Sequence, residues 1–153
     1  MKEINVKGTV RTALGKKAAR DIRKANAVPC NLYGEAKNEN GAPQALSFTA
    51  TNDELRNLIY SPDIYAVNLN IDGKECKAVL KEIQIHPVKD NVLHVDFYEI
   101  TENKPIVMEV PIKLNGLAEG VKAGGRLAAS VRKLKVKALY TNIPERLNID
   151  VTN

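Results

Sequence analysis

Two side chains that could perform acid-base or metal chemistry stand close together in the segment QIHPVKDNVLHVDF, residues 84–97. His94 and Asp96 are two residues apart, and the other histidine of the chain, His86, lies in the same segment. An imidazole beside a carboxylate can activate water or help to hold a metal ion. A metal site needs three or four converging ligands, and the remaining acids are scattered along the chain. The sequence therefore favours another use for this pair, and we expect His86 to be a loop histidine with local hydrogen bonds.

The second chemically distinctive group of residues is basic and lies near the N-terminus. Residues 1–34 carry eight Lys or Arg against two acids, whereas the rest of the chain carries 15 basic and 16 acidic side chains. A localised excess of positive charge is typical of a protein that contacts a polyanion. A basic face kept only for solubility normally mixes the two signs of charge.

The segment GKKAARDIRKAN, residues 15–26, predicts a helix that orders these charges. At 100° per residue its apolar residues share one side: Ala18, Ala19, Ile22 and Ala25. The opposite side carries a cationic row: Lys16, Arg20 and Arg23, with Arg11 just upstream. Asn26 should end the helix, because asparagine tolerates the left-handed conformation.

Most of the remaining chain alternates apolar and polar residues with the period of two that strands require. Such strands are predicted over residues 4–10, 45–50, 66–71, 75–83, 91–100, 105–114, 131–140 and 146–151. Asp72-Gly73 predicts a two-residue hairpin, and TNDELRNLIY, residues 51–60, predicts a second short helix capped by Thr51 or Asn52. The fold class is therefore mainly β (α+β), with antiparallel pairing.

The elements that must position His94 and Asp96 follow from the same alternation. In NVLHVDFYEI, Leu93, Val95 and Phe97 alternate with His94, Asp96 and Tyr98, so that the histidine and the aspartate share an outward face. An outward carboxylate beside phosphates would be repelled unless it accepts hydrogen bonds from base amino groups or from a cationic neighbour. Asp96 is therefore a candidate for reading a base or for holding His94.

Other features of the composition narrow the class of protein. No apolar run approaches the ~18 residues of a membrane span, and MKEINVKGTV contains no apolar signal region. Cys30 and Cys76 are far apart and outside any CxxC spacing, which favours reduced core residues in a cytoplasmic protein. The segment NGLAEGVKAGGRL, residues 115–127, lacks the Gly-Lys-Ser/Thr ending of a nucleotide loop and predicts a long turn.

Four segments together resemble one protein family. They are RTALGKKAARDIRKANAVPCNLYG, KEIQIHPVKDNVLHVDFYEI, VPIKLNGLAEGVKAGGRL and NIPERLNIDV. Their combination resembles the bacterial large-subunit ribosomal protein twenty-five, in its longer CTC or general-stress form. The resemblance runs in register over nearly the whole chain.

This resemblance implies a non-enzymatic, cytoplasmic, ribosome-associated protein that binds the loop E region of 5S ribosomal RNA, without cofactor or metal. It implies a small antiparallel β-barrel with two short helices over residues 1–100 and a second β domain over residues 101–153, with a boundary near 101–105. The second domain would contact neighbouring ribosomal proteins or ribosomal RNA. The implied RNA-binding residues are Arg11, Lys16, Arg20, Arg23, Tyr33, Lys81, His94 and Asp96.

The chain departs from the family pattern in three places. Asp21 stands where some members have a basic residue, and Asn26 replaces a frequent glycine. The sequence ends at Asn153, earlier than in many long-form members, so we expect either a short second domain or part of a longer chain. Two alternative functions remain open: a general oligonucleotide-binding stress protein, and a small metal-dependent hydrolase that uses His94 and Asp96.

Overall fold

The computed structural model describes residues 2–37, 43–61, 63–101 and 103–152. By contacts they form two compact units, the first from residues 2–61 and 65–101 and the second from residues 63–64 and 103–152. Glu102, within the predicted boundary, and Asn153 lie outside the described residues.

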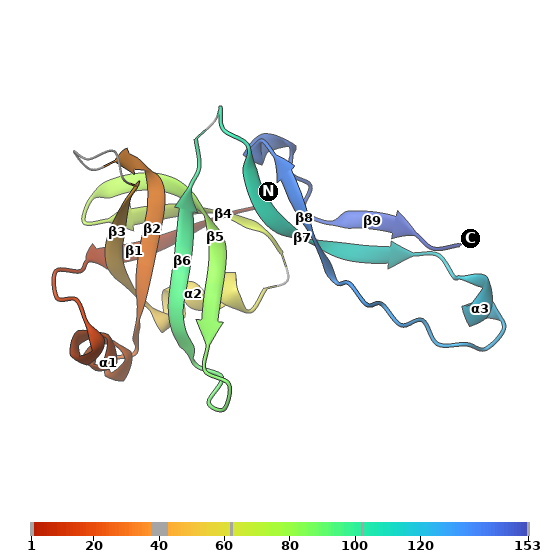
Figure 1. Cartoon of the computed structure of the whole chain (residues 1–153), viewed down its shortest axis with the longest axis horizontal. Coiled ribbons are helices and arrows are strands. Elements are labelled where there is room, and N and C mark those ends of the chain that lie inside the picture. Colours follow the sequence, from red (N-terminus) through yellow and green to blue (C-terminus); the bar gives the residue numbers. More distant parts are fainter. Residues whose placement is uncertain (1, 38–42, 62, 102, 153) are drawn as a thin grey trace. The chain divides into compact units, whose positions relative to one another are not determined.

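The first unit is a closed barrel of six strands in the order β1-β3-β2-β6-β5-β4 (Figure 1). Its strands are β1 (Lys2–Val10), β2 (Ala27–Lys37), β3 (Pro43–Thr51), β4 (Tyr65–Ile71), β5 (Lys74–Ile85) and β6 (Val92–Glu99). The mainly β class with a small barrel, predicted from the sequence, is confirmed. The alternation does not single out β2, whose Pro29 interrupts the pattern of a central strand. Pro29 is accommodated because the pairing of β2 with β6 begins only at Cys30.

The expectation of purely antiparallel pairing is wrong at two places in the barrel. β1 pairs with β4 in parallel, and β2 pairs with β6 in parallel. A period of two places side chains on faces but says nothing about the direction of the partner strand. Antiparallel pairing follows directly only where a tight turn joins the strands, as Asp72 (φ 48°) and Gly73 (φ 87°) join β4 to β5.

The barrel core is built from alternating apolar residues and two phenylalanines. Phe48 and Phe97 are fully buried, and their ring centroids lie 5.8 Å apart at an interplanar angle of 37°. Gly8 is required beside them, because a Cβ at this position would stand 2.6 Å from Phe48 Cδ2. The core therefore depends on a close approach of the β1 backbone to an aromatic ring.

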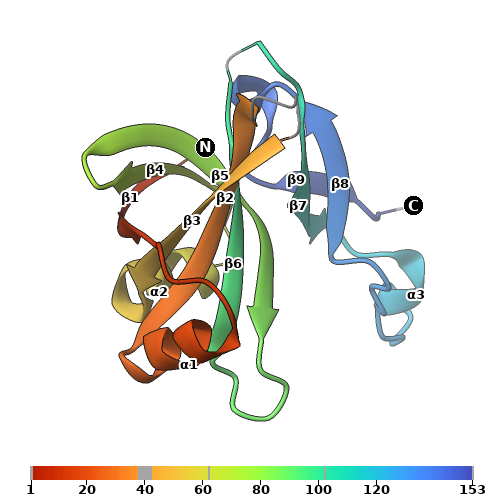
Figure 2. The same cartoon turned by 60° about the vertical axis from the view of Figure 1, so that its left-hand side comes forward.

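Helix α2 (Asn52–Ile59) contributes to this core from one end of the barrel (Figure 2). Thr51 caps it by accepting a hydrogen bond from the Glu54 backbone N–H at 3.4 Å. Leu55 and Leu58 are buried in the same core as the strand residues. The helix and its cap thus match the sequence prediction.

Helix α1 (Lys16–Lys24) lies at the same end of the barrel and is attached much less deeply (Figures 1 and 2). None of its residues is buried. Ala18, Ala19 and Ile22 are half-buried, while Ala25 is exposed, which corrects its assignment to the inward side. The helix ends at Lys24, so Ala25 lies outside it and does not extend its apolar side.

The turn after α1 is held by an amide pair. Asn26 adopts a positive φ of 58°, as predicted for the end of the helix. Its side-chain oxygen accepts a hydrogen bond of 2.8 Å from Asn52 Nδ2, and its backbone carbonyl accepts one of 3.1 Å from the Asn52 N–H. These two hydrogen bonds therefore connect the C-terminal end of α1 to the N-terminal end of α2.

The second unit contains a three-stranded sheet in the order β8-β7-β9. Its elements are β7 (Ile106–Asn115), α3 (Glu119–Lys122), β8 (Lys133–Ala138), a 3-10 helix (Tyr140–Asn142) and β9 (Leu147–Asp150). β7 pairs antiparallel with β8 and parallel with β9. Its buried residues include Ile106, Val110 and Ile143. The glycine-rich segment, predicted as a turn, also contains the single turn of helix α3.

Replacing Asn26 tests the amide pair and the left-handed turn together. We expect Asn26→Ala to lower the free energy of unfolding by about 1–3 kcal/mol, because alanine is strained at positive φ and the bond to Asn52 is lost. Asn26→Gly loses the same bond without the strain and should cost about 1 kcal/mol less. Urea denaturation followed by circular dichroism measures both. Equal stability of the two variants would contradict the role of the backbone conformation.

Candidate nucleic-acid interface

A polar row crosses four adjacent strands on the outer side of the barrel. The register pairs Ser47 of β3 with Asn31 of β2, Asn31 with Asp96 of β6, and Asp96 with Glu82 of β5. All four side chains are half-buried or exposed, whereas their neighbours Cys30, Phe48, Val95 and Phe97 point into the core. The barrel thus presents both hydrogen-bond donors and hydrogen-bond acceptors on one continuous surface.

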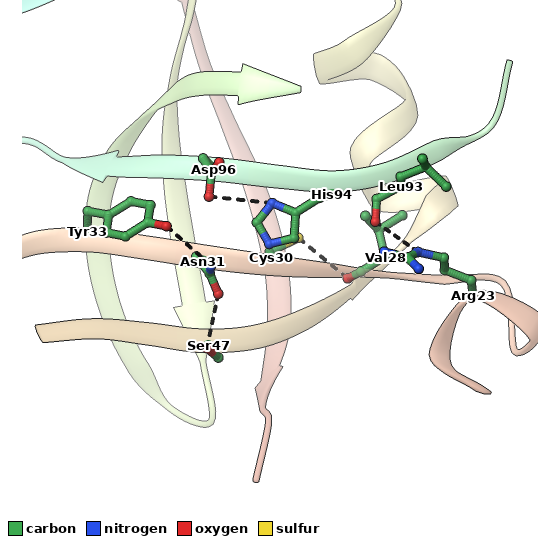
Figure 3. Close-up of polar contacts among 9 residues, drawn as sticks. All are labelled: Arg23, Val28, Cys30, Asn31, Tyr33, Ser47, Leu93, His94 and Asp96. Carbon is green, nitrogen blue, oxygen red and sulfur yellow. Dashed lines mark hydrogen bonds and ion pairs between the residues drawn. The ribbon is translucent and has the colours of Figure 1, made fainter. Parts of the chain in front are cut away.

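Hydrogen bonds order the β2 and β3 part of this row (Figure 3). Ser47 Oγ donates to Asn31 Oδ1 at 3.0 Å, and Asn31 Nδ2 donates to the Tyr33 hydroxyl at 3.3 Å. Tyr33 is 38% exposed. Asn31 and Ser47 were not among the predicted site residues. The alternation of Asn31 and Tyr33 around buried Leu32 is the signal that would have identified Asn31.

His94 and Asp96 face one another on β6 and are both half-buried. The distance from His94 Nδ1 to Asp96 Oδ1 is 3.5 Å, and the side chains are 20% and 18% exposed. That distance exceeds a normal hydrogen bond, and Asp96 Oδ1 has no hydrogen-bond partner among the described residues although it is buried. Leaving a buried acceptor unpaired costs about 1–3 kcal/mol, so shortening of the contact between this oxygen and His94 Nδ1 would be favoured.

Two β-bulges shape the surface around this pair. Leu93 is the extra residue where β6 passes from the Gln84–His94 pair to the Ile85–Val92 pair. Val92 is buried while Leu93 is half-buried, so the strict alternation that assigned Leu93 to the core is wrong at this residue. Lys81 is the corresponding extra residue of β5, and its side chain is exposed. Bulges commonly redirect side chains beside functional surfaces.

The bulge at Leu93 also attaches the cationic helix. Arg23 Nε donates a hydrogen bond of 3.0 Å to the Leu93 carbonyl oxygen (Figure 3). This bond connects α1 to the strand that carries His94 and Asp96. Because α1 has no buried residue, we infer that this bond contributes substantially to its orientation.

The other predicted cations differ in how strongly they are held. Lys16 and Arg20 are exposed on α1, and neither side chain has a hydrogen bond or ion pair within the described parts of the chain. Arg11 is half-buried after β1, and its Nε donates to the Ala13 carbonyl oxygen at 2.8 Å. Two cations are therefore unrestrained, while Arg11 and Arg23 are held by backbone carbonyls.

His86 does not belong to this surface and acts locally. Its Nδ1 accepts hydrogen bonds of 3.2 Å from the backbone N–H groups of Val88 and Lys89. This is the loop histidine expected from the sequence. Within the described residues, no three His, Cys, Asp or Glu side chains are grouped so as to hold a metal ion.

Cys30 lies directly behind the polar row and is a core residue. Burial raises the pKa of its thiol to about 12, and the negative charge of Asp96 acts in the same direction. Burial also raises the pKa of the half-buried Cys76 thiol. Both cysteines are free and stay protonated at neutral pH, so neither offers a thiolate for chemistry. Among the described helices, none has the length and apolar character needed to cross a bilayer.

Comparison with known families identifies both parts of the chain. The model of the Ribosomal L25p family matches residues 6–97, which include the barrel surface described above. The chain belongs to the ribosomal L25p family. Residues 105–153 match the model described as Ribosomal protein TL5, C-terminal domain. Residues 98–104 separate the two matched ranges.

Curated relatives carry the same family name over the full length of this chain. A large ribosomal subunit protein bL25 of Phocaeicola vulgatus is 64% identical over 153 residues, covering 100% of this chain and 77% of the relative. Proteins of the same name from Bacteroides thetaiotaomicron and Porphyromonas gingivalis are 58% and 52% identical, each covering 100% of this chain and 77% of the relative. These L25p relatives are named as ribosomal proteins and not as enzymes.

The raised thiol pKa of Cys30 can be tested by alkylation. At pH 8 we expect iodoacetamide to modify Cys30 very slowly in the folded protein, because burial suppresses the thiolate that reacts. Cys76 should react sooner, and both should react rapidly in urea. Mass spectrometry of peptides measures each site separately. Equal rates for Cys30 in the folded and unfolded chain would contradict its placement in the core.

Proposed function

We propose that this L25p family member is a structural constituent of the large ribosomal subunit that binds 5S ribosomal RNA through α1 and the adjoining polar row. The names of its relatives support ribosomal membership and a structural rather than enzymatic role. The 5S RNA, its loop E region and the contacting residues rest on the motif resemblance and on the chemistry of the barrel surface.

The observation that carries the proposal is the hydrogen bond from Arg23 to the Leu93 carbonyl oxygen. It joins a helix with an exposed cationic row to a sheet face rich in hydrogen-bonding groups. Lysine and arginine neutralise phosphates and release counterions, which supplies affinity without reading sequence. The adjoining sheet can then supply recognition of bases.

To recognise bases, the sheet needs side chains that bind base edges or base rings and do not simply attract phosphates. Asp96 can accept hydrogen bonds from base amino groups through the exposed part of its carboxylate, since its side chain is 18% exposed while Oδ1 is buried against His94. Tyr33 offers a partly exposed ring on which a base can stack. The negative charges of Asp96 and Glu82 in the same row argue against general phosphate binding at this point.

Structured RNA suits a surface of this composition. Regular double-stranded RNA has a deep, narrow major groove that side chains cannot read, so specific recognition uses loops and bulges with accessible base edges. A short helix with a cationic row can enter a groove that an internal loop has widened. Arg23 and Arg20 can also contact phosphates through two N–H groups at once, which lysine cannot do.

Lys16 and Arg20 provide the sharpest test of the cationic row, because neither side chain has a partner within the described chain. Lys16→Ala with Arg20→Ala should weaken binding to 5S RNA at least about tenfold at moderate salt. It should also reduce the slope of log K against log salt by about 1.4 to 1.8, since each of the two phosphate contacts contributes roughly 0.7–0.9. Filter binding over a series of salt concentrations measures both quantities.

Lys17→Ala with Lys24→Ala is the matched control, because it removes the same charge from positions centred roughly 70° around α1 from Lys16 and Arg20. We expect a smaller loss of affinity from this pair. Equal losses would show that net charge alone matters and would reject the cationic row. Competition by unstructured single-stranded RNA as strong as that by 5S RNA would instead favour a general oligonucleotide-binding protein.

Asp96→Asn tests recognition by the sheet. The amide keeps the shape of the carboxylate but loses its charge and one acceptor oxygen, so we expect affinity for 5S RNA to fall by about 1–3 kcal/mol. Thermal unfolding of the free protein should be followed in parallel, because removal of an unpaired buried carboxylate oxygen can itself change stability.

Glu82→Gln is the control for Asp96→Asn, since it makes the same chemical change at the directly paired position of β5. We expect its affinity to stay constant or to rise slightly as a negative charge is removed. If Asp96→Asn raises affinity in the same way, Asp96 only repels RNA and has no role in reading a base.

A further inference from the structure

A second concentration of positive charge lies in the C-terminal unit. Residues 110–138 contain seven Lys or Arg and a single acid, Glu119. The sum over the whole chain after residue 34 conceals this excess, because residues 35–109 contain 13 acids and seven bases. The net charges of residues 35–109 and 110–138 have opposite signs and cancel in the sum, although the two segments belong largely to different units of the fold.

The strands place four of these lysines on one face of the sheet. Lys133, Lys135 and Lys137 alternate along β8 with Leu134, Val136 and Ala138, and their cross-strand partners are Pro111, Glu109 and Val107. Lys113 of β7 follows the same alternation and is therefore on this face too. We call Lys113, Lys133, Lys135 and Lys137 the lysine face. Neighbouring β8 lysines are about 7 Å apart along the strand, since each residue advances about 3.3–3.4 Å.

The lysine face is exposed, and its charges are not neutralised within the unit. None of its four ammonium groups has an ion pair or hydrogen bond with a described residue. Glu109 lies opposite Lys135 in the ladder without forming an ion pair to it in the described structure. On β9, Asp150 accepts hydrogen bonds from Thr152 instead. An anion that binds here would break no existing ion pair of these lysines.

The need to protect an edge strand from pairing with another chain explains only some of these lysines. Lysine on an exposed edge strand prevents pairing with another chain, and β8 is an edge of its sheet. Lys113, however, lies on the central strand β7, and Arg126 and Arg132 add positive charge in the connection between β7 and β8. The charge therefore spreads over a surface that is wider than the edge.

The composition of the face favours nucleic acid over a protein partner. Protein interfaces are enriched in Tyr, Trp, Phe, Met and Arg and are depleted in Lys. The lysine face has no aromatic residue, and although Val107 and Pro111 lie beside its lysines, the buried apolar side chains of β7, such as Met108 and Val110, point to the opposite face. Flexible ammonium groups act as point charges for phosphates and need no fixed geometry.

We propose that the lysine face of the C-terminal unit binds the phosphate backbone of RNA without reading bases. This contact is separate from the barrel surface and does not depend on the proposed recognition of 5S RNA. It gives the C-terminal unit an affinity for RNA that falls steeply with salt and varies little with sequence.

The experiment uses the full chain carrying Lys16→Ala and Arg20→Ala, so that the barrel surface contributes less. The probe is an RNA duplex of arbitrary sequence and about 20 base pairs, and fluorescence anisotropy follows binding between about 50 and 200 mM KCl. Adding Lys133→Ala, Lys135→Ala and Lys137→Ala should lower affinity at least tenfold at the lowest salt. It should reduce the salt slope by about 2 to 3, which corresponds to three phosphate contacts.

Two control variants should not show the loss of affinity expected for the alanine variant. Replacing the same three lysines by arginine keeps the charge and should preserve at least half of the affinity. Glu109→Gln removes the acid paired with Lys135 across the ladder and should raise affinity about two- to threefold. Circular dichroism of each variant checks that the sheet remains folded.

Two results would overturn the proposal. One is unchanged affinity and salt slope in the folded triple alanine variant. The other is tighter binding of poly-glutamate than of the duplex, which would assign the face to an acidic protein. Binding of 5S RNA by the chain with an intact barrel surface is measured separately, so a failure here leaves the proposed function untouched.

Discussion

The parallel pairing of β2 with β6 is the constraint on which the barrel surface depends. It sets Asn31 beside Asp96 and Tyr33 beside Tyr98, so that polar groups from distant parts of the sequence form one row. The same register turns Cys30, Val95 and Phe97 inward, where Phe97 meets Phe48. A shift by one residue would exchange these faces and would destroy the core and the surface together.

The barrel surface divides its tasks between a rigid part and a lightly attached part. The polar row lies on strands whose opposite faces fill the core, so its positions are fixed by packing. The cationic helix has no buried residue and is oriented by the bond from Arg23 to Leu93 and by the Asn26–Asn52 pair. Phosphate binding tolerates such freedom because it acts over longer distances than base recognition.

Much of this architecture could be predicted from the residues themselves. The alternation located most strands, Asp72-Gly73 identified a hairpin, and Thr51 identified a helix start, because each of these signals is local. Three features depend on residues that are distant in sequence. They are the parallel pairing of β1 with β4, the bulges at Leu93 and Lys81, and the exposure of Ala25. Those features could not be derived from a local pattern.

The candidate surface shows the same division. His94 and Asp96 were found because they are close in sequence, whereas Asn31 and Ser47 join them only through strand register. The basic segment of residues 110–138 is hidden in the composition for a different reason. A net charge summed over residues that belong to different units averages out the local excess, so charge is informative only when it is counted along elements that fold together.

The second unit is discontinuous in sequence, which affects how it can be assembled. Asp63 and Ile64, from the connection between α2 and β4, belong to it, and Arg146 Nη2 donates a hydrogen bond of 2.7 Å to Asp63 Oδ1. Ile64 is buried. A fragment that begins after the barrel therefore lacks part of its own core and the carboxylate that holds Arg146. During synthesis, residues 63–64 emerge before the strands with which they are grouped, so the second unit can be completed only after β4, β5 and β6 have also been made.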